Sequence, residues 1–209
     1  MSAAAWPVTL SVPPVGLRPL RYRDARAWDE LRRRNTDWLR PWDATSSDPR
    51  AAPVSFRSMV RRLNAQARMG ESMPWALTVH DALAGQVNVS GIVRGSAQSA
   101  HIGYWIGQEF AGHGYVPTGV AMAIDHCLLG MGLHRVEINI RPENAASLRV
   151  VEKLGLRAEG RRERYLHIDG DWRDHLSFAV TVEEVPDGLL ARWRRDTPPH
   201  LPRSDPSSP

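Results

Sequence analysis

The chain has 209 residues, 42% of them hydrophobic and 24% charged, and a formal net charge of +4 at pH 7. This length supports one sizeable core, so we expect one domain with appendages rather than two full domains. The single cysteine, Cys127, excludes an intramolecular disulfide and a cysteine-based zinc cluster, and it fits the reducing environment of the cytoplasm.

Arginine supplies nearly all of the positive charge, because Lys153 is the only lysine, and this bias suggests a bacterial genome of high GC content. Short arginine runs occur at 32–34, 161–162 and 194–195, without a dense basic stripe along the sequence. We therefore expect no dedicated nucleic-acid binding, although an RNA-binding protein remains a third hypothesis. The N-terminus lacks a signal-peptide pattern, and Asp125 and His126 interrupt the longest apolar segment, so no membrane segment is expected.

The first half of the sequence predicts a flexible N-terminal segment, two helices and several strands. Residues 1–15 are expected to be flexible, because three prolines there oppose regular structure. The stretch GLRPLRYRD predicts an edge strand, since Pro19 cannot donate to a ladder, and Asp24 can cap a helix to about residue 34. A second helix follows over about 54–69. From Pro74 a period of two predicts an antiparallel meander of the stretches WALTVHD, QVNVSGIVR and AHIGYWIG.

The second half alternates helices and strands. A helix is expected to begin at Pro117, and the strand HRVEINIR follows it. Asn144 can cap the next helix, in ENAASLRVVEKLG, and two strands of about 157–168 and 172–182 meet at a DGD hairpin. The expected domain spans 16–185, a short helix covers 186–195, and the Pro- and Ser-rich tail 196–209 is expected to be disordered.

The stretch EFAGHGYVPTGV sets Gly112 and Gly114 one residue apart, between a strand and a helix. Such a loop aims backbone N–H groups at one point, and the helix dipole adds to the attraction for an anion. The stretch lacks the Gly-Lys-Ser or Gly-Lys-Thr of triphosphate loops, and Pro117 replaces the third glycine of the dinucleotide fingerprint. A pyrophosphate-binding loop between a meander and a helix remains, and an ordinary turn is the plainer alternative.

Three stretches together resemble the GCN5-related N-acetyltransferases (GNAT), and within them the RimJ/RimL-type ribosomal-protein-alanine acetyltransferase branch. They are IGYWIGQEFAGHGYVPTGVAMAIDHCL, VEINIRPENAASLRVVEKLGLRAEG and DGDWRDHLSFAV. The likeness covers roughly residues 16–185. It implies an α+β fold, in which a mixed, mostly antiparallel central sheet of about six to seven strands is flanked by helices. A splayed strand pair in this sheet would hold acetyl-CoA.

By this resemblance the backbone of the glycine loop would cradle the pyrophosphate of acetyl-CoA, and the end of the preceding strand would pair with the pantetheine arm. Asn144 would contact coenzyme A, and Ser147 would hydrogen-bond the leaving thiolate. Ala111 and Val116 depart from the family's usual residues at the two ends of the loop, but backbone donors survive such changes. The implied cofactor-binding residues are Trp105, Ile106, Ala111, Gly112, His113, Gly114, Tyr115, Val116, Asn144 and Ser147.

The catalytic and acceptor residues follow less directly. His101 stands where many relatives carry an acidic residue, so His101, or a water relayed through it, becomes the candidate base beside Ser147. The resemblance places Trp38, Leu39 and Trp42 along the acceptor groove. Each position also has a plainer structural interpretation: a packed histidine, a helix-capping serine and core tryptophans. No metal is implied.

The sequence therefore predicts an acetyl-CoA-dependent N-acetyltransferase acting on an α-amine, with the N-terminus of a ribosomal protein as the implied acceptor. An α-amine has a pKa near 8, so an appreciable fraction is neutral at physiological pH and a strong base is dispensable. A small amine, such as an antibiotic or an amino acid, is the alternative acceptor. A non-catalytic acyl-CoA-binding module is the alternative of another class. Either a monomer or a homodimer is compatible with the sequence.

Overall fold

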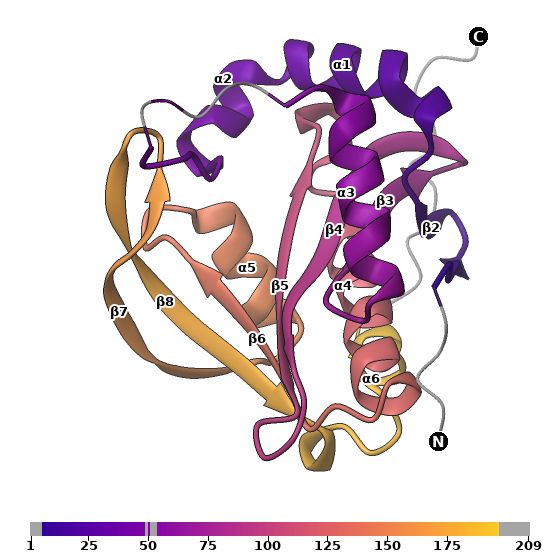
Figure 1. The fold of residues 1–209 in the computed structure, drawn as a ribbon. Helices are drawn as coiled ribbons and strands as arrows, with labels where there is room; N and C mark the ends of the chain where they lie inside the picture. The colour runs from indigo at the N-terminus through magenta and orange to yellow at the C-terminus, as the bar shows by residue number, and fades with distance from the viewer. Residues whose placement is uncertain (1–5, 49, 51–53, 197–209) are drawn as a thin grey trace, which may run out of the picture.

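A single eight-stranded sheet carries helices on both faces in the computed structural model, which describes residues 6–48, 50 and 54–196 (Figure 1). The strand order is β1-β2-β3-β4-β5-β6-β8-β7, and all neighbours are antiparallel except β5 and β6. The strands are β1 (Leu10–Val12), β2 (Val15–Pro19), β3 (Met73–Val79), β4 (Ala82–Val93), β5 (Ser99–Ile106), β6 (Arg135–Ile140), β7 (Arg157–Ile168) and β8 (Asp171–Thr181).

The helices divide between the two faces of the sheet (Figure 1). The α-helices are α1 (Ala25–Arg34), α2 (Thr36–Leu39), α3 (Phe56–Arg68), α4 (Tyr115–Asp125), α5 (Ala145–Lys153) and α6 (Leu189–Asp196). Short 3-10 turns are η1 (Tyr22–Asp24), η2 (Arg40–Trp42), η3 (Gln108–Phe110) and η5 (Val182–Glu184), and α4 continues into the π-helical segment η4 (His126–Gly130). On the first face α1 and α3 cover a small cluster around Val60. On the second, α4, α5 and α6 bury the main core.

Most elements expected from the sequence are present. The meander is β3, β4 and β5, and the DGD hairpin turns through left-handed Asp169 and Gly170, with φ of 46° and 80°. The helix expected at Pro117 begins two residues earlier, at Tyr115. Within the described residues, no helix is both long and apolar enough to cross a membrane.

The N-terminal segment differs from the expectation. Residues 10–12 form β1, which pairs with β2, and Trp6 is buried with its Nε1 donating to Asn64 Oδ1 at 2.8 Å. Ordered structure therefore begins before residue 15, and β1 brings the sheet to eight strands instead of six or seven. The strand of Pro19 is also not an edge, because β2 lies between β1 and β3. Pro19 is tolerated since it ends β2, beyond the three residues that pair with β1.

The C-terminal helix α6 is anchored by a carboxylate from another helix. Asp125, the last residue of α4, accepts hydrogen bonds from the backbone N–H groups of Leu189 at 2.5 Å and Leu190 at 3.1 Å. These are orphan donors at the start of α6, so Asp125 acts as its cap from a distance. Burial raises the pKa of Asp125, while the two backbone hydrogen bonds lower it in part. The expected disordered tail lies outside the described residues, apart from Asp196, which ends α6.

We expect Asp125→Ala to lower the free energy of unfolding by about 1–2 kcal/mol, because two N–H groups at the start of α6 lose their acceptor. Urea unfolding followed by tryptophan fluorescence measures the change. Asp187→Ala is the matched control, since Asp187 is exposed just before the same helix. Identical unfolding curves for Asp125→Ala and the wild type would contradict the anchoring role.

Candidate functional site

The parallel pairing between β5 and β6 is short, and the two strands separate beyond it (Figure 1). Only Ser99 to His101 pair with Arg135 to Glu137, whereas β5 stays paired with β4 up to Ile106 and β6 stays paired with β8 up to Ile140. A cavity of about 940 Å³ opens at this separation. The splayed strand pair expected from the sequence is therefore present.

Residues from distant parts of the chain line this cavity. The α2 and η2 segment, the end of β5, the glycine loop, the end of β6, α5 and the β7–β8 hairpin all contribute. Most of the site residues expected from the sequence are among them: Trp38, Leu39, Trp42, Trp105, Ile106, Ala111, Gly112, Gly114, Tyr115, Val116, Asn144 and Ser147. His101 and His113 are the two expected residues that do not line it. The His113 ring instead stacks on Tyr115, with ring centroids 5.4 Å apart.

The glycine loop presents a row of free backbone donors. Gly112 and Gly114 adopt left-handed φ values of 84° and 80°, which only glycine adopts without strain, and Gly114 is the N-cap of α4. In the described part of the chain, none of the N–H groups from Gly112 to Val116 donates to a backbone carbonyl. Unpaired donors beside the positive end of a helix form a site for an anion.

Contacts on both sides hold this loop in place. Behind it, Trp193 of α6 donates from Nε1 to Thr118 Oγ1 at 3.1 Å. In front of it, the buried Asn35 accepts from the N–H of Gln108 at 2.7 Å and donates to Glu109 at 3.1 Å. The loop is thus fixed to α6 on one side and to the end of α1 on the other.

The start of α5 forms the opposite wall. Asn144 Oδ1 accepts from the N–H of Ser147 at 3.0 Å, so Asn144 is the N-cap of α5, while both side chains also line the cavity. The phenol of Tyr104 donates to the carbonyl of Ser147 at 3.4 Å. Burial raises the pKa of Tyr104, so the phenol keeps its proton at neutral pH. Capping and a role in the site are therefore compatible for Asn144.

The tryptophans expected at the acceptor groove are tied to the cavity wall. Trp38 Nε1 donates to the carbonyl of Ile106, the last residue of β5, at 3.0 Å. The guanidinium of Arg141 lies over the Trp42 ring, 5.4 Å from its centroid, and donates to the carbonyl of Pro41 at 2.7 Å. These contacts hold the α2 and η2 segment across one end of the cavity.

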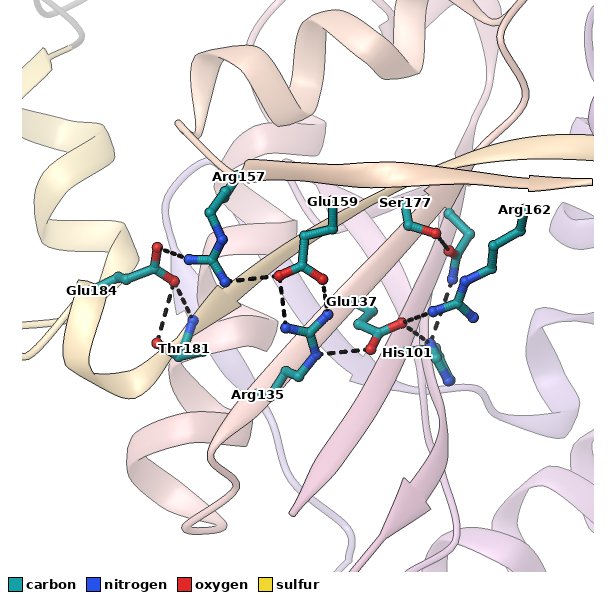
Figure 2. Close-up of polar contacts among 10 residues, drawn as sticks. His101, Arg135, Glu137, Arg157, Glu159, Arg162, Ser177, Thr181 and Glu184 are labelled. Atoms are coloured by element: carbon teal, nitrogen blue, oxygen red, sulfur yellow. Dashed lines mark hydrogen bonds and ion pairs between the residues drawn. The ribbon is translucent and has the colours of Figure 1, made fainter. Parts of the chain in front are cut away.

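His101 lies at the closed end of the strand pair, in a polar network (Figure 2). Its Nδ1 is 3.5 Å from Glu137 Oε2, and Glu137 also accepts from Arg135 at 2.8 Å and from Arg162 at 2.7 Å. Burial alone would raise the pKa of Glu137, but the hydrogen bond and charge of Arg135, with the charges of His101 and Arg162, lower it on balance. The carboxylate therefore stays charged, and His101 faces an ion-pair network rather than the cavity.

Sequence reasoning missed a second histidine, His175 of β8, which is buried and lines the cavity. Its Nδ1 lies 3.0 Å from the carbonyl of Arg173. A carbonyl can only accept, so Nδ1 carries the proton and, in the neutral ring, Nε2 keeps the lone pair. Burial lowers the pKa of His175, which keeps the ring neutral. The only local signal was a histidine in the strand stretch DHLSF, which follows the DGD turn closely and was interpreted only as part of the hairpin.

Charged side chains at the cavity were also missed. Arg149 and Lys153 are four residues apart on α5, so they lie on one face of that helix, and both line the cavity. Two carboxylates line it as well, and each is paired: Asp43 with Arg32, at 2.5 Å, and Glu143 with Arg141, at 3.2 Å. No group of three His, Cys, Asp or Glu side chains that could hold a metal ion occurs in the described residues.

Comparison with known proteins shows which family has this architecture. The profile of the acetyltransferase (GNAT) domain matches residues 15–157. The chain is 29% identical to the [ribosomal protein uS5]-alanine N-acetyltransferase of Escherichia coli, over 85% of this chain and 92% of that protein. It is 38% identical to Mycobacterium smegmatis RimJ, solved in complex with CoA-disulfide, with a TM-score of 0.84 over 91% and 95% of the two chains.

A further structure, the ribosomal-protein-S5-alanine acetyltransferase from Vibrio fischeri, is 25% identical with a TM-score of 0.73, over 83% of this chain and 96% of that one. These findings confirm the fold and the resemblance expected from the sequence. The chain belongs to the GNAT family of N-acetyltransferases.

Proposed function

We propose that this protein transfers the acetyl group of acetyl-CoA to the α-amine at the N-terminus of a protein, with ribosomal proteins as the acceptor class. The observation that carries the proposal is the row of unpaired N–H groups from Gly112 to Val116 at the mouth of the splayed strands. The relatives support the acceptor class, because two of those above are named as acetyltransferases of a ribosomal-protein alanine. RimJ supports the cofactor, since it was solved in complex with CoA-disulfide.

The cofactor would bind through backbone and charge. The N–H groups of the glycine loop would hold the pyrophosphate, and Arg149 and Lys153 add positive charge for an anionic ligand on the wall formed by α5. Beyond the closed end of the strand pair, the main chain of β5 at Trp105 and Ile106 would pair with the pantetheine arm. The Ile106 carbonyl already accepts from Trp38, so this pairing would rely on the other main-chain groups.

The reaction needs a neutral amine, a proton acceptor and a donor to the leaving group. The amine nitrogen attacks the thioester carbon, the C–S bond breaks, and sulfur leaves as coenzyme A thiolate. In this proposal Nε2 of His175 accepts the proton that the amine loses, because it is the unprotonated nitrogen of a neutral ring at the cavity. The hydroxyl of Ser147, at the start of α5, would donate to the thiolate. His101 remains the alternative base.

We call the end of the cavity that is covered by α2 and η2 the acceptor end. Its residues favour an uncharged N-terminal segment over a polycationic small amine. Its walls include the rings of Trp38 and Trp42 and the side chains of Leu166 and Ile168. The two carboxylates of the cavity, Asp43 and Glu143, are neutralised by arginines, so they offer little attraction for several ammonium groups. The relatives named for acetylation of an alanine support a small first residue in the acceptor.

We expect steady release of free coenzyme A thiol when acetyl-CoA is mixed with peptides carrying the N-termini of ribosomal proteins. Peptides whose α-amine is already acetylated are the control, because they keep any lysine amines and lose only the proposed acceptor. Thiol release is followed with a colorimetric reagent, and mass spectrometry locates the added acetyl group. Binding of acetyl-CoA without turnover on any peptide or small amine would leave a binding module as the better description.

We expect Gly112→Ala to weaken the binding of CoA about tenfold or more, because alanine is strained at a φ of 84° and relief of that strain would turn the neighbouring N–H donors away from one another. Gly132→Ala is the matched control. Gly132 has a φ of 66° and, like Gly112, no atom within 4 Å of an added Cβ, but it does not line the cavity. Isothermal calorimetry measures the affinity. Equal losses of CoA affinity in both variants would contradict the cradle.

We expect His175→Gln to lower kcat about a hundredfold, because a general base of this kind contributes a factor of that order or more. Burial lowers the pKa of His175 from its ordinary value of 6.5, so the wild-type kcat should show a decline on the acid side of neutrality in addition to the titration of the acceptor amine. Only the decline that belongs to His175 should vanish in the variant. The imidazole ring of His175 contacts the carbonyl of Arg173 and the ring of Tyr165. The charges of Arg141, Asp174 and Glu143 also act on its pKa, with smaller effects than burial.

His101→Gln is the matched control for the base, because it removes the other candidate histidine. Its kcat should stay near the wild-type value, since His101 does not line the cavity. A large loss in His101→Gln with little change in His175→Gln would reverse the assignment and leave the acetyl transfer itself intact. Calorimetry with CoA on both variants separates a loss of the base from a loss of cofactor binding.

A further inference from the structure

A set of exposed arginines gathers on the face of the molecule formed by η1 and α3. They are Arg21, Arg23, Arg57, Arg61, Arg62 and Arg68, and together with the exposed Tyr22 we call them the arginine surface. Two separate segments of the chain supply it, and contact between η1 and α3 brings them together. The guanidinium of Arg57 lies over the ring of Tyr22, 4.9 Å from its centroid. Arginines that are dispersed along the sequence are therefore brought to one face by the fold.

None of these six arginines forms an ion pair within the described part of the chain. The arginines of the sheet behave differently, since Arg135, Arg157 and Arg162 are each paired with glutamates (Figure 2). The sequence of α3, FRSMVRRLNAQAR, contains no acidic residue. The acidic residue of η1, Asp24, is buried and paired with Arg18 at 2.7 Å. Thus no ion pair among the described residues compensates the charge of these arginines, although Arg21 lies close enough to Asp24 for the two charges to interact.

The geometry of α3 spaces these charges regularly. Arg57 and Arg61 are one helical turn apart, which corresponds to about 6 Å along the axis, and Arg68 lies two turns further on the same side. The buried Val60 and Ala67 hold α3 against the rest of the protein, and the exposed arginines lie on the adjoining flank of the helix, where their guanidinium groups reach solvent. The result is a line of cations about 16 Å long.

The chemistry of this surface favours RNA over a membrane or an acidic protein. A membrane-binding helix would carry large apolar side chains between its basic ones, whereas the exposed residues between the arginines of α3 are Ser58 and Ala65. The exposed apolar side chains of this region, Val54 and Met69, lie beyond the two ends of α3. Guanidinium forks match phosphate oxygens, and an exposed aromatic ring among them offers a stacking partner for an unpaired base. The exposed acids nearest in sequence are Glu71, just after α3, and Asp29 and Glu30 on α1, of which Glu30 pairs with Arg34 at 3.7 Å.

We propose that the arginine surface binds the phosphate backbone of RNA. The helix α1 follows η1 directly and leads into α2, whose Trp38 and Leu39 line the cavity. RNA held on this surface would therefore lie about one length of α1, roughly 15 Å, from the end of the cavity lined by α2. The inference goes beyond the proposed function, because RNA binding needs neither acetyl-CoA nor turnover.

The test measures the affinity for a short, fluorescein-labelled single-stranded RNA by fluorescence anisotropy over a series of salt concentrations. Arg61→Gln/Arg62→Gln removes two adjacent arginines from the surface, and Arg57→Gln/Arg68→Gln provides a second, independent pair. If each removed arginine contacts one phosphate, either double variant should lower the slope of log affinity against log salt by about 1.4. The affinity at low salt should fall severalfold or more in both.

Arg194→Gln/Arg195→Gln is the matched control, because it removes an adjacent exposed pair from α6, on the other side of the sheet. Its salt slope and affinity should equal those of the wild type. The proposal is overturned if all three double variants bind alike. It is also overturned if the surface variants lose binding to polyglutamate or to anionic vesicles but keep their affinity for RNA. No acetyl donor is present, so the result is independent of the proposed reaction.

Discussion

The point at which β5 and β6 stop pairing controls the rest of the structure. Beyond His101 and Glu137, β5 remains in the ladder with β4 and β6 remains in the ladder with β8, so the sheet splits between them. Each strand already has a full partner on its other side, and separating them therefore breaks few hydrogen bonds of the sheet. Main-chain groups at the open edges become available for a ligand, as in peptide recognition by an exposed strand.

The polar network at the closed end holds the split where it is. Glu137 draws together His101 from β5, its neighbour Arg135 and Arg162 from β7, while Ser177 of β8 donates to Asn139 of β6 at 2.7 Å (Figure 2). These contacts tie β6 to β7 and β8 more firmly than to β5. A buried carboxylate is stable only when it is paired and hydrogen-bonded, so the network resists rearrangement of the strands. His101 belongs to this network through Glu137 and does not line the cavity.

The glycine loop depends on contacts from both ends of the chain. Trp193 and Asp125 secure α6 against α4 from behind, and Asn35 secures the loop from the side of α1. The N–H groups between these supports stay unpaired, which is unusual for backbone donors at a partly buried site. A rigid loop whose donors are already oriented binds an anion with little loss of conformational entropy.

The amino-acid sequence by itself determined the local elements and the kind of ligand site. Alternating apolar residues, Gly112 and Gly114, the Asn144 cap and the DGD turn act over a few neighbouring residues, so their consequences are readable in chain order. Only the tertiary structure decided which distant residues meet. It brought His175 and Lys153 to the cavity, moved His101 into an ion-pair network, and gathered the arginines of η1 and α3 on one face. Such contacts depend on strand pairing and helix packing between segments far apart, and no local pattern encodes them.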